Sequence, residues 1–144
     1  DPAFKIAVVG LKQEGPYAPG GARAGDGRLA ILPMLSDGRL RALYGQARAV
    51  IVPSLLEGFG LYAAEALFEG APLALSNRGA HPEVGGEAAL YFDPLDREDF
   101  LEKVRAALTP ETAARLKANA ARQAEKFRWR AAARRVIDLY LCSP

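Results

Sequence analysis

Cysteine is scarce in this sequence, which has only Cys142 among its 144 residues. A single cysteine excludes an internal disulfide and a cysteine-based metal cluster, and it is typical of a reducing, cytoplasmic compartment. Net charge is also small, because 19 Lys and Arg residues against 17 Asp and Glu residues leave +2. A chain this close to neutral has no overall field that would attract nucleic acid or an anionic membrane.

Long apolar runs and a recognisable leader are absent as well. No run approaches the roughly 20 residues that a membrane-spanning helix needs, and the first residues, Asp1-Pro2-Ala3-Phe4-Lys5, do not form a signal peptide. They include no initiator methionine, so we expect the chain to begin inside a longer sequence. Apolar residues are abundant, at 50%, and they suffice for one compact domain that spans residues 1–144.

Short apolar runs alternate with amphipathic segments along the chain. The β-branched run at 5–9 stops at Gly10 and predicts a strand buried on both faces. Similar runs predict strands at 29–32, 50–52, 73–75 and 90–92. Helices are predicted after Ser36-Asp37, Gly60, Asp96 and Thr109-Pro110, and over about 130–141. Residues 13–28, rich in Gly and Pro, predict a plain flexible connection.

This alternation predicts the fold class. Strands followed by helices form βα units, so we expect an α/β, Rossmann-like open parallel sheet of about five strands flanked by helices. Ligands of such sheets bind at the carboxyl ends of the strands.

One stretch, residues 53–70, combines the features of a ligand site. The turn Glu57-Gly58-Phe59-Gly60 follows a predicted strand, and an amphipathic helix then runs from Leu61 and stops at Gly70. Glycines allow close backbone approach, and a helix start offers free N–H groups to a phosphate. Glu57 and Glu65 flank the helix start, and a carboxylate can accept hydrogen bonds from vicinal hydroxyls. Spacing alone leaves two interpretations, a site for a phosphorylated, hydroxyl-rich ligand or two ordinary surface acids.

The same stretch resembles the donor-site signature of the group 1 retaining glycosyltransferases of the GT-B fold. The resemblance covers roughly residues 29–140 and corresponds to the C-terminal, nucleotide-sugar-binding domain of these enzymes. It is carried by Pro53-Ser54, Glu57-Gly58-Phe59-Gly60-Leu61, Glu65-Ala66, Gly70-x-Pro72, Ser76-Asn77, Gly79, Pro82-Glu83-Val84, Gly86-Glu87-Ala88-Ala89-Leu90, Asp93-Pro94 and Asp96.

The resemblance implies glycosyl transfer from a nucleoside-diphosphate sugar to an acceptor with retention of configuration. Glu57, the catalytic candidate, would bind hydroxyls of the donor sugar, and Glu65 would hold the ribose hydroxyls. Enzymes of this kind generally need no metal, and we expect no cofactor. Contacts to the sugar and phosphates would come from the turn and the helix start, at Gly58, Phe59, Gly60 and Leu61. Weaker candidates for the nucleobase are Pro33, Met34 and Leu40.

Two features depart from the family pattern. Tyr62 stands where the family usually has proline, which we interpret as a mild change at the helix start. The family's diphosphate-binding Arg and Lys, the domain's usual first strand and the acceptor-binding N-terminal domain all precede the part that this chain resembles. We therefore expect a sheet that lacks its usual first strand and a chain that is inactive alone. We also expect marginal stability or a homo-oligomer in isolation.

The C-terminal stretch is strongly basic. Residues 115–135 hold eight Lys and Arg residues and one acid, Glu125, a net charge of +7. They form either a solvated helix face or a surface for acidic lipid headgroups at a membrane or for a partner domain. We expect residues 128–144 to form a helix that packs on the domain, with Trp129 as its anchor.

Two further interpretations complete the prediction. His81, the only histidine, lies in a Gly-Ala-His-Pro segment and is interpreted as a loop residue. The alternative function is a non-catalytic nucleotide-binding or interaction module of the same fold. The intact pair Glu57 and Glu65 favours the enzyme, whereas the absent basic residues favour the module.

Overall fold

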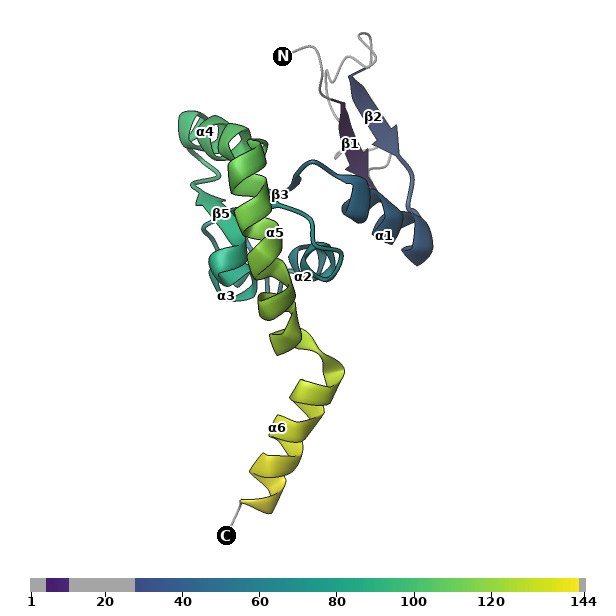
Figure 1. Ribbon diagram of the computed structural model, residues 1–144, viewed down its shortest axis with the longest axis vertical. Coiled ribbons are helices and arrows are strands. Elements are labelled where there is room, and N and C mark those ends of the chain that lie inside the picture. The colour runs from purple at the N-terminus through teal and green to yellow at the C-terminus, as the bar shows by residue number, and fades with distance from the viewer. Residues whose placement is uncertain (1–4, 11–27, 143–144) are drawn as a thin grey trace. The chain divides into compact units, whose positions relative to one another are not determined.

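The computed structural model describes residues 5–10 and 28–142, and Figure 1 shows its helices and strands. By backbone contacts the chain divides into two compact units, Asp1–Leu40 and Arg41–Pro144. The predicted connection at 13–28 lies, apart from its last residue, outside the described residues. That residues 1–144 form a single domain stays a prediction.

The first unit contains a sheet of two parallel strands. Strand β1 (Ile6–Val9) pairs with β2 (Leu29–Leu32) in a register that runs from Ile6 opposite Leu29 to Val9 opposite Leu32. Both strands lie where the sequence predicts them. Burial of β1 on both faces was a wrong expectation, because Ile6 is 58% exposed. The physical reason is that the faces of a strand are buried only by elements packed on them, and among the described residues the extensive contact of β1 is with β2, which lies beside it in the sheet.

The second unit contains a sheet of three parallel strands in the order β3-β4-β5. Its strands are β3 (Val50–Val52), β4 (Leu73–Ser76) and β5 (Ala89–Phe92). Helix α1 (Asp37–Gln46) spans the division between the units. The predicted α/β class is confirmed, with five parallel strands and flanking helices, and these strands form two sheets.

Helices cover both faces of the three-stranded sheet. On one face, Ala74 and Phe92 pack with Ala107 of α4 (Arg97–Ala107), and the Phe92 and Phe100 rings meet edge to face at 5.0 Å. On the other face, a Cβ at Gly85 would lie 2.8 Å from Leu75 Cδ1, which places α3 (His81–Gly85) directly against β4. Helix α2 (Leu61–Phe68) contacts α3 and α5 (Pro110–Ala124), and α5 also contacts the 3-10 turn η2 (Gly86–Ala88). This core holds the carboxyl edge of β3-β4-β5 in place.

Two predicted helix starts are confirmed with their caps. Asp96 Oδ1 accepts the N–H groups of Glu98 at 2.8 Å and Asp99 at 3.1 Å, whereas Thr109 Oγ1 accepts only that of Thr112, at 3.4 Å. We predict that Asp96→Ala lowers the free energy of unfolding by about 1 kcal/mol, because it removes two short hydrogen bonds at a helix start. Thr109→Ala should cost less. Urea unfolding of both variants tests this, and an equal loss for the two would contradict it.

Tyr91 makes stability sensitive to high pH. Burial raises the pKa of Tyr91 to about 12 from the ordinary 10.0, and its hydroxyl donates to the carbonyl of Gly86 at 2.8 Å. Because the folded pKa is the higher one, this contribution is fully present below pH 10 and is lost as the pH rises toward 12. We predict that Tyr91→Phe reduces the fall in unfolding free energy between about pH 9 and about pH 12. Urea unfolding across that range tests it, and an unchanged slope would contradict it.

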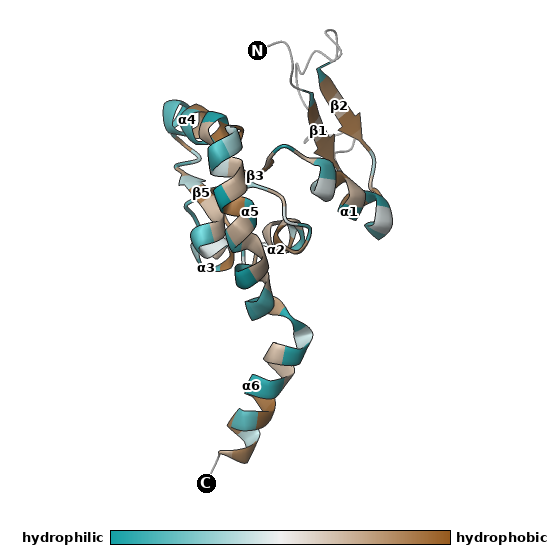
Figure 2. Cartoon of the chain, viewed as in Figure 1, coloured by the Kyte–Doolittle hydropathy of each residue, from teal (hydrophilic) through white to brown (hydrophobic). Residues whose placement is uncertain are grey.

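Helix α6 (Trp129–Leu141) lies outside the core of its unit, and none of its residues is buried. Trp129 is 89% exposed and Tyr140 80% exposed, so the interpretation of Trp129 as an anchor is wrong. Figure 2 shows hydrophobic and hydrophilic residues alternating along this helix. The packing of residues 128–144 on the domain stays a prediction. Contact of this basic region with a membrane or a partner domain stays a prediction, as does self-association.

Within the described residues, no helix is both long and apolar enough to cross a membrane.

Candidate functional site

The candidate site lies at the carboxyl edge of the sheet β3-β4-β5. The register pairs Val52 with Leu75 and Ser76 with Phe92, so the three strands end at the same edge. The chain leaves β3 through Pro53 and Ser54 and reaches the turn at Glu57. This edge is where parallel α/β sheets bind their ligands.

The glycine turn delivers the chain into α2 at the predicted position, Leu61. Gly60 is the residue before the helix and has φ 87°, a left-handed conformation that glycine adopts without strain. Its carbonyl accepts the N–H groups of Ala63 and Ala64, each at 3.1 Å, and no side chain caps the helix start. The mild interpretation of Tyr62 agrees with this geometry. An uncapped helix start can bind an anion through its first N–H groups.

Glu57 is held at both its side chain and its backbone. Ser54 Oγ donates to Glu57 Oε1 at 2.8 Å, and the Ala80 N–H donates to the Glu57 carbonyl at 3.3 Å. Gly79, with φ +57°, lies so close that a Cβ there would be 2.7 Å from the Glu57 carbonyl oxygen. Glu57 is half-buried, and its carboxylate keeps acceptor capacity because the hydrogen bond from Ser54 uses only one of its lone-pair sites.

Glu65 lies on α2 with an exposed carboxylate. Tyr44 Oη, on α1, donates to Glu65 Oε2 at 3.2 Å. Burial and the negative charge of Glu65 raise the pKa of Tyr44 above its ordinary value, so the phenol remains a hydrogen-bond donor. Each of the two predicted carboxylates thus has one hydroxyl partner and keeps lone pairs for a ligand.

The remaining candidates are distributed around this turn. Phe59 packs edge to face against Phe127, with ring centroids 5.6 Å apart, while Leu61 is exposed and a Cβ at Gly58 would meet nothing within 4 Å. Phe127, rather than Trp129, makes an aromatic contact with the rest of its unit. The nucleobase candidates belong to the first unit and the turn to the second; they are Pro33, Met34 and Leu40.

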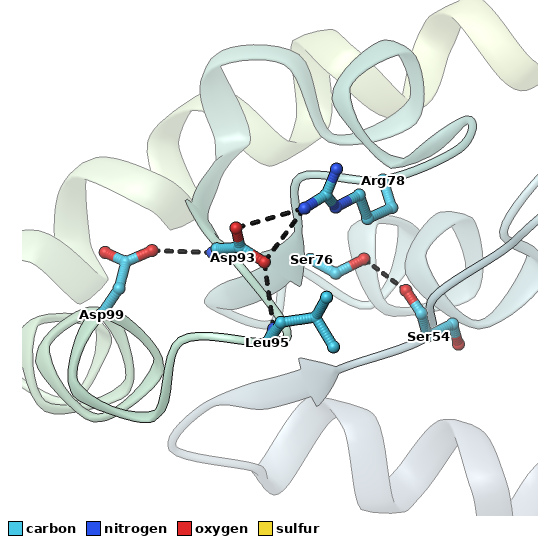
Figure 3. Close-up of polar contacts among 6 residues, drawn as sticks. All are labelled: Ser54, Ser76, Arg78, Asp93, Leu95 and Asp99. Atoms are coloured by element: carbon cyan, nitrogen blue, oxygen red, sulfur yellow. Dashed lines mark hydrogen bonds and ion pairs between the residues drawn. The ribbon is translucent and has the colours of Figure 1, made fainter.

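Arg78 and Asp93 form an ion pair at the same edge of the sheet (Figure 3). Arg78 Nη2 lies 3.2 Å from each carboxylate oxygen of Asp93. The Leu95 N–H, and after it the Arg78 guanidinium, hold the pKa of Asp93 below its ordinary range. This pair closes the loop after β5 against the loop after β4.

His81 is a correction to the sequence interpretation. It lies at the start of α3 rather than in a loop, it is fully buried, and its Nδ1 lies 2.8 Å from Ser76 Oγ. Ser76 Oγ in turn donates to the Ser54 carbonyl at 2.6 Å, as Figure 3 shows. The sequence pattern assigned no role to Ser76 or Tyr44 and placed His81 in a loop, because the contacts of Ser76 with Ser54 and of Tyr44 with Glu65 join residues distant in sequence.

No group of three or more His, Cys, Asp or Glu side chains that could hold a metal ion occurs in the part of the chain that the structure describes.

Comparison with known proteins gives a family match. The family described as "Glycosyl transferases group 1" matches residues 23–125, which include the turn and both carboxylates. The match also crosses the division between the two compact units.

Individual relatives agree with this match. The chain is 40% identical over 112 residues to the serotype-specific mannosyltransferase WbdA of Escherichia coli, covering 77% of this chain and 14% of the relative. It is 38% identical over 111 residues to the MMP alpha-(1->4)-mannosyltransferase of Mycolicibacterium hassiacum, covering 74% and 27%. The chain therefore spans under a third of these relatives.

Among solved structures, sucrose-phosphate synthase from Thermosynechococcus elongatus matches with a TM-score of 0.76 at 24% identity. The match covers 94% of this chain and 37% of that structure. It supports the fold.

Proposed function

This chain belongs to the group 1 glycosyl transferases, and we propose that it is the donor-binding half of an enzyme that moves a sugar from a nucleoside diphosphate to an acceptor with retention of configuration. The observation that carries the proposal is the pair of oriented carboxylates around an uncapped helix start. Glu57 is held by Ser54 and Glu65 by Tyr44, on either side of the N-terminus of α2.

The two carboxylates divide the ligand between them. Glu57, in the turn, accepts hydrogen bonds from hydroxyls of the donor sugar, and Glu65, further along α2, accepts those of the ribose. The first N–H groups of α2 meet the diphosphate, whose negative charge the helix dipole favours. As the glycosidic bond breaks, charge grows on the leaving diphosphate, and the same N–H groups stabilise it more strongly. Backbone contacts to the sugar and the phosphates come from Gly58, Phe59, Gly60 and Leu61.

The transfer reaction needs more than these residues. The relatives are several times longer than this chain, and we place the acceptor site in a further, N-terminal domain of the natural protein. In that arrangement the 144-residue chain alone binds the nucleotide weakly and does not transfer sugar.

The donor carries mannose in our first proposal, because both of these relatives are named as mannosyltransferases. A thermal-shift and calorimetric screen of the natural full-length protein against GDP-mannose, UDP-glucose and ADP-glucose tests this. We expect at least one of these nucleotide sugars to bind, and GDP-mannose to bind most strongly. Preference for another sugar would change only the donor, whereas no binding to any of them would contradict the proposed function.

The assignment of the two glutamates makes a sharper prediction. Glu65→Gln should weaken binding of both the nucleotide sugar and the nucleoside diphosphate alone, by about tenfold or more, since a hydrogen bond to a charged group contributes about 1.5–3 kcal/mol. Glu57→Gln should weaken binding of the nucleotide sugar and leave the nucleoside diphosphate unaffected. Calorimetric titration with GDP-mannose and with GDP measures both effects. Equal effects of Glu57→Gln on the two ligands, or an effect of Glu65→Gln on GDP-mannose alone, would contradict the division of roles.

A further inference from the structure

His81 is a fully buried polar residue that the donor site as described does not use. The side chain has no exposed surface, and its Nε2 has no hydrogen-bond partner among the described residues. A buried polar atom without a partner costs about 1–3 kcal/mol, so a histidine at this place needs a compensating role.

The hydrogen bonds around Ser76 determine which ring nitrogen carries the proton. A serine hydroxyl has one proton to donate, and Ser76 Oγ donates it to the Ser54 carbonyl at 2.6 Å. In the 2.8 Å contact between Ser76 Oγ and His81 Nδ1, the serine must therefore accept. Nδ1 therefore carries a proton, and Nε2 is the ring nitrogen left without a partner.

This chain of hydrogen bonds ends at Glu57. The His81 N–H holds Ser76, Ser76 holds the Ser54 carbonyl, and Ser54 Oγ donates to Glu57 Oε1 at 2.8 Å. The residue before His81, Ala80, donates its backbone N–H to the Glu57 carbonyl at 3.3 Å. The segment at the start of α3 therefore controls both the backbone and the carboxylate of Glu57.

The other edge of the imidazole faces the start of α2. A Cβ at Gly60 would lie 3.2 Å from His81 Cδ2 and 3.7 Å from Nε2. His81 thus packs against the turn that follows Glu57, whereas the hydrogen-bond partner of Glu65 is Tyr44.

We propose that His81, as the Nδ1–H tautomer, is a positioning residue of the donor site that orients Glu57 through Ser76 and Ser54. The inference rests on the proposed function, because Glu57 is the carboxylate assigned to the donor sugar. It follows that His81 acts on recognition of the sugar and leaves recognition of the nucleotide to Glu65 and Tyr44.

The tautomer has a direct test, because the chain contains one histidine. Nitrogen-15 NMR of the uniformly labelled 144-residue chain records a single imidazole. We expect a protonated Nδ1 and an unprotonated Nε2. A proton on Nε2 with none on Nδ1 would overturn the inference, since His81 could then not donate to Ser76.

The role in positioning is tested by binding in the natural full-length protein. His81→Leu introduces an apolar side chain of similar length and so removes both ring nitrogens. Ser76→Ala breaks the same chain of hydrogen bonds with a smaller change in volume. Both should weaken GDP-mannose binding by about tenfold and leave GDP binding unchanged. His81→Asn, whose amide can donate where Nδ1–H does, should recover most of the affinity.

A double-mutant cycle separates positioning from a merely structural role. In the Glu57→Gln background, His81→Leu should have little further effect on GDP-mannose binding, because its effect passes through that carboxylate. Additive losses, or equal losses for GDP and GDP-mannose, would overturn the inference.

Should His81→Leu fail to fold, Ser76→Ala gives the same cycle. If Glu57→Gln itself leaves GDP-mannose binding intact, the proposed function fails; if Glu57→Gln weakens it and Ser76→Ala does not, only the role of His81 fails.

Discussion

Glu57→Gln in the natural full-length protein is expected to lower kcat/KM for sugar transfer by about a hundredfold. The variant keeps the size of the side chain and its contact with Ser54 but removes the negative charge that strengthens hydrogen bonds to the sugar hydroxyls. Loss of one such bond in a preorganised site is worth about 10²-fold when it strengthens in the transition state. Initial rates over a range of donor concentrations, with GDP-mannose as the first donor, measure the effect.

The matched control is Glu102→Gln on α4. Glu102 is an exposed acid whose contact is a surface pair with Lys103 at 2.7 Å, and such pairs contribute little. Its transfer rate should equal that of the unmodified protein. Unchanged kinetics in Glu57→Gln would contradict the site and favour the non-catalytic module of the same fold.

Gly79→Ala is expected to give the largest structural effect of a single methyl group. The new Cβ would lie 2.7 Å from the carbonyl oxygen of Glu57 and 2.9 Å from its nitrogen, and Gly79 has φ +57°. Backbone atoms cannot rotate away as a flexible side chain can, so the Glu57 segment must move. We expect a loss of more than about 2 kcal/mol in unfolding free energy, together with loss of GDP-mannose binding.

Gly70→Ala separates the steric clash from the strain of a left-handed backbone conformation. Gly70 has φ +69°, and a Cβ there meets nothing within 4 Å. It should therefore cost only the left-handed strain, roughly 1–2 kcal/mol, and leave ligand binding intact. Urea unfolding and calorimetric titration of both variants measure the difference. Equal losses of stability with full binding in Gly79→Ala would contradict a steric role for this close approach.

The local elements of this chain were predictable because their signals lie within a few residues. Asp96 and Thr109-Pro110 predict helix starts whose caps the structure confirms, and the apolar runs predict the five strands. The family signature of residues 53–70 was readable for the same reason, since Glu57, the glycine turn and Glu65 are neighbours in sequence. Signals of this kind need no knowledge of what packs against them.

Burial was the part that local patterns predicted poorly. The first half of the apolar strand β1, Ile6 and Ala7, is exposed, and Trp129 is solvent-exposed on a helix without a buried residue. His81, predicted for a loop, is instead fully buried. Each outcome depends on which other segment of the chain covers the residue, and that information is not local.

The sequence by itself determined the α/β class and the strand and helix positions, because these follow from periodicity and caps. It pointed to the pair Glu57 and Glu65 through the family signature, since spacing alone left them open to interpretation as surface acids. Only the tertiary structure decided what orients that pair. Ser76 and His81 come to Glu57 from the ends of other elements, and Tyr44 comes to Glu65 from α1. Hydrogen bonds between residues far apart in sequence form only where packing brings the strand ends together, so no local pattern could predict them.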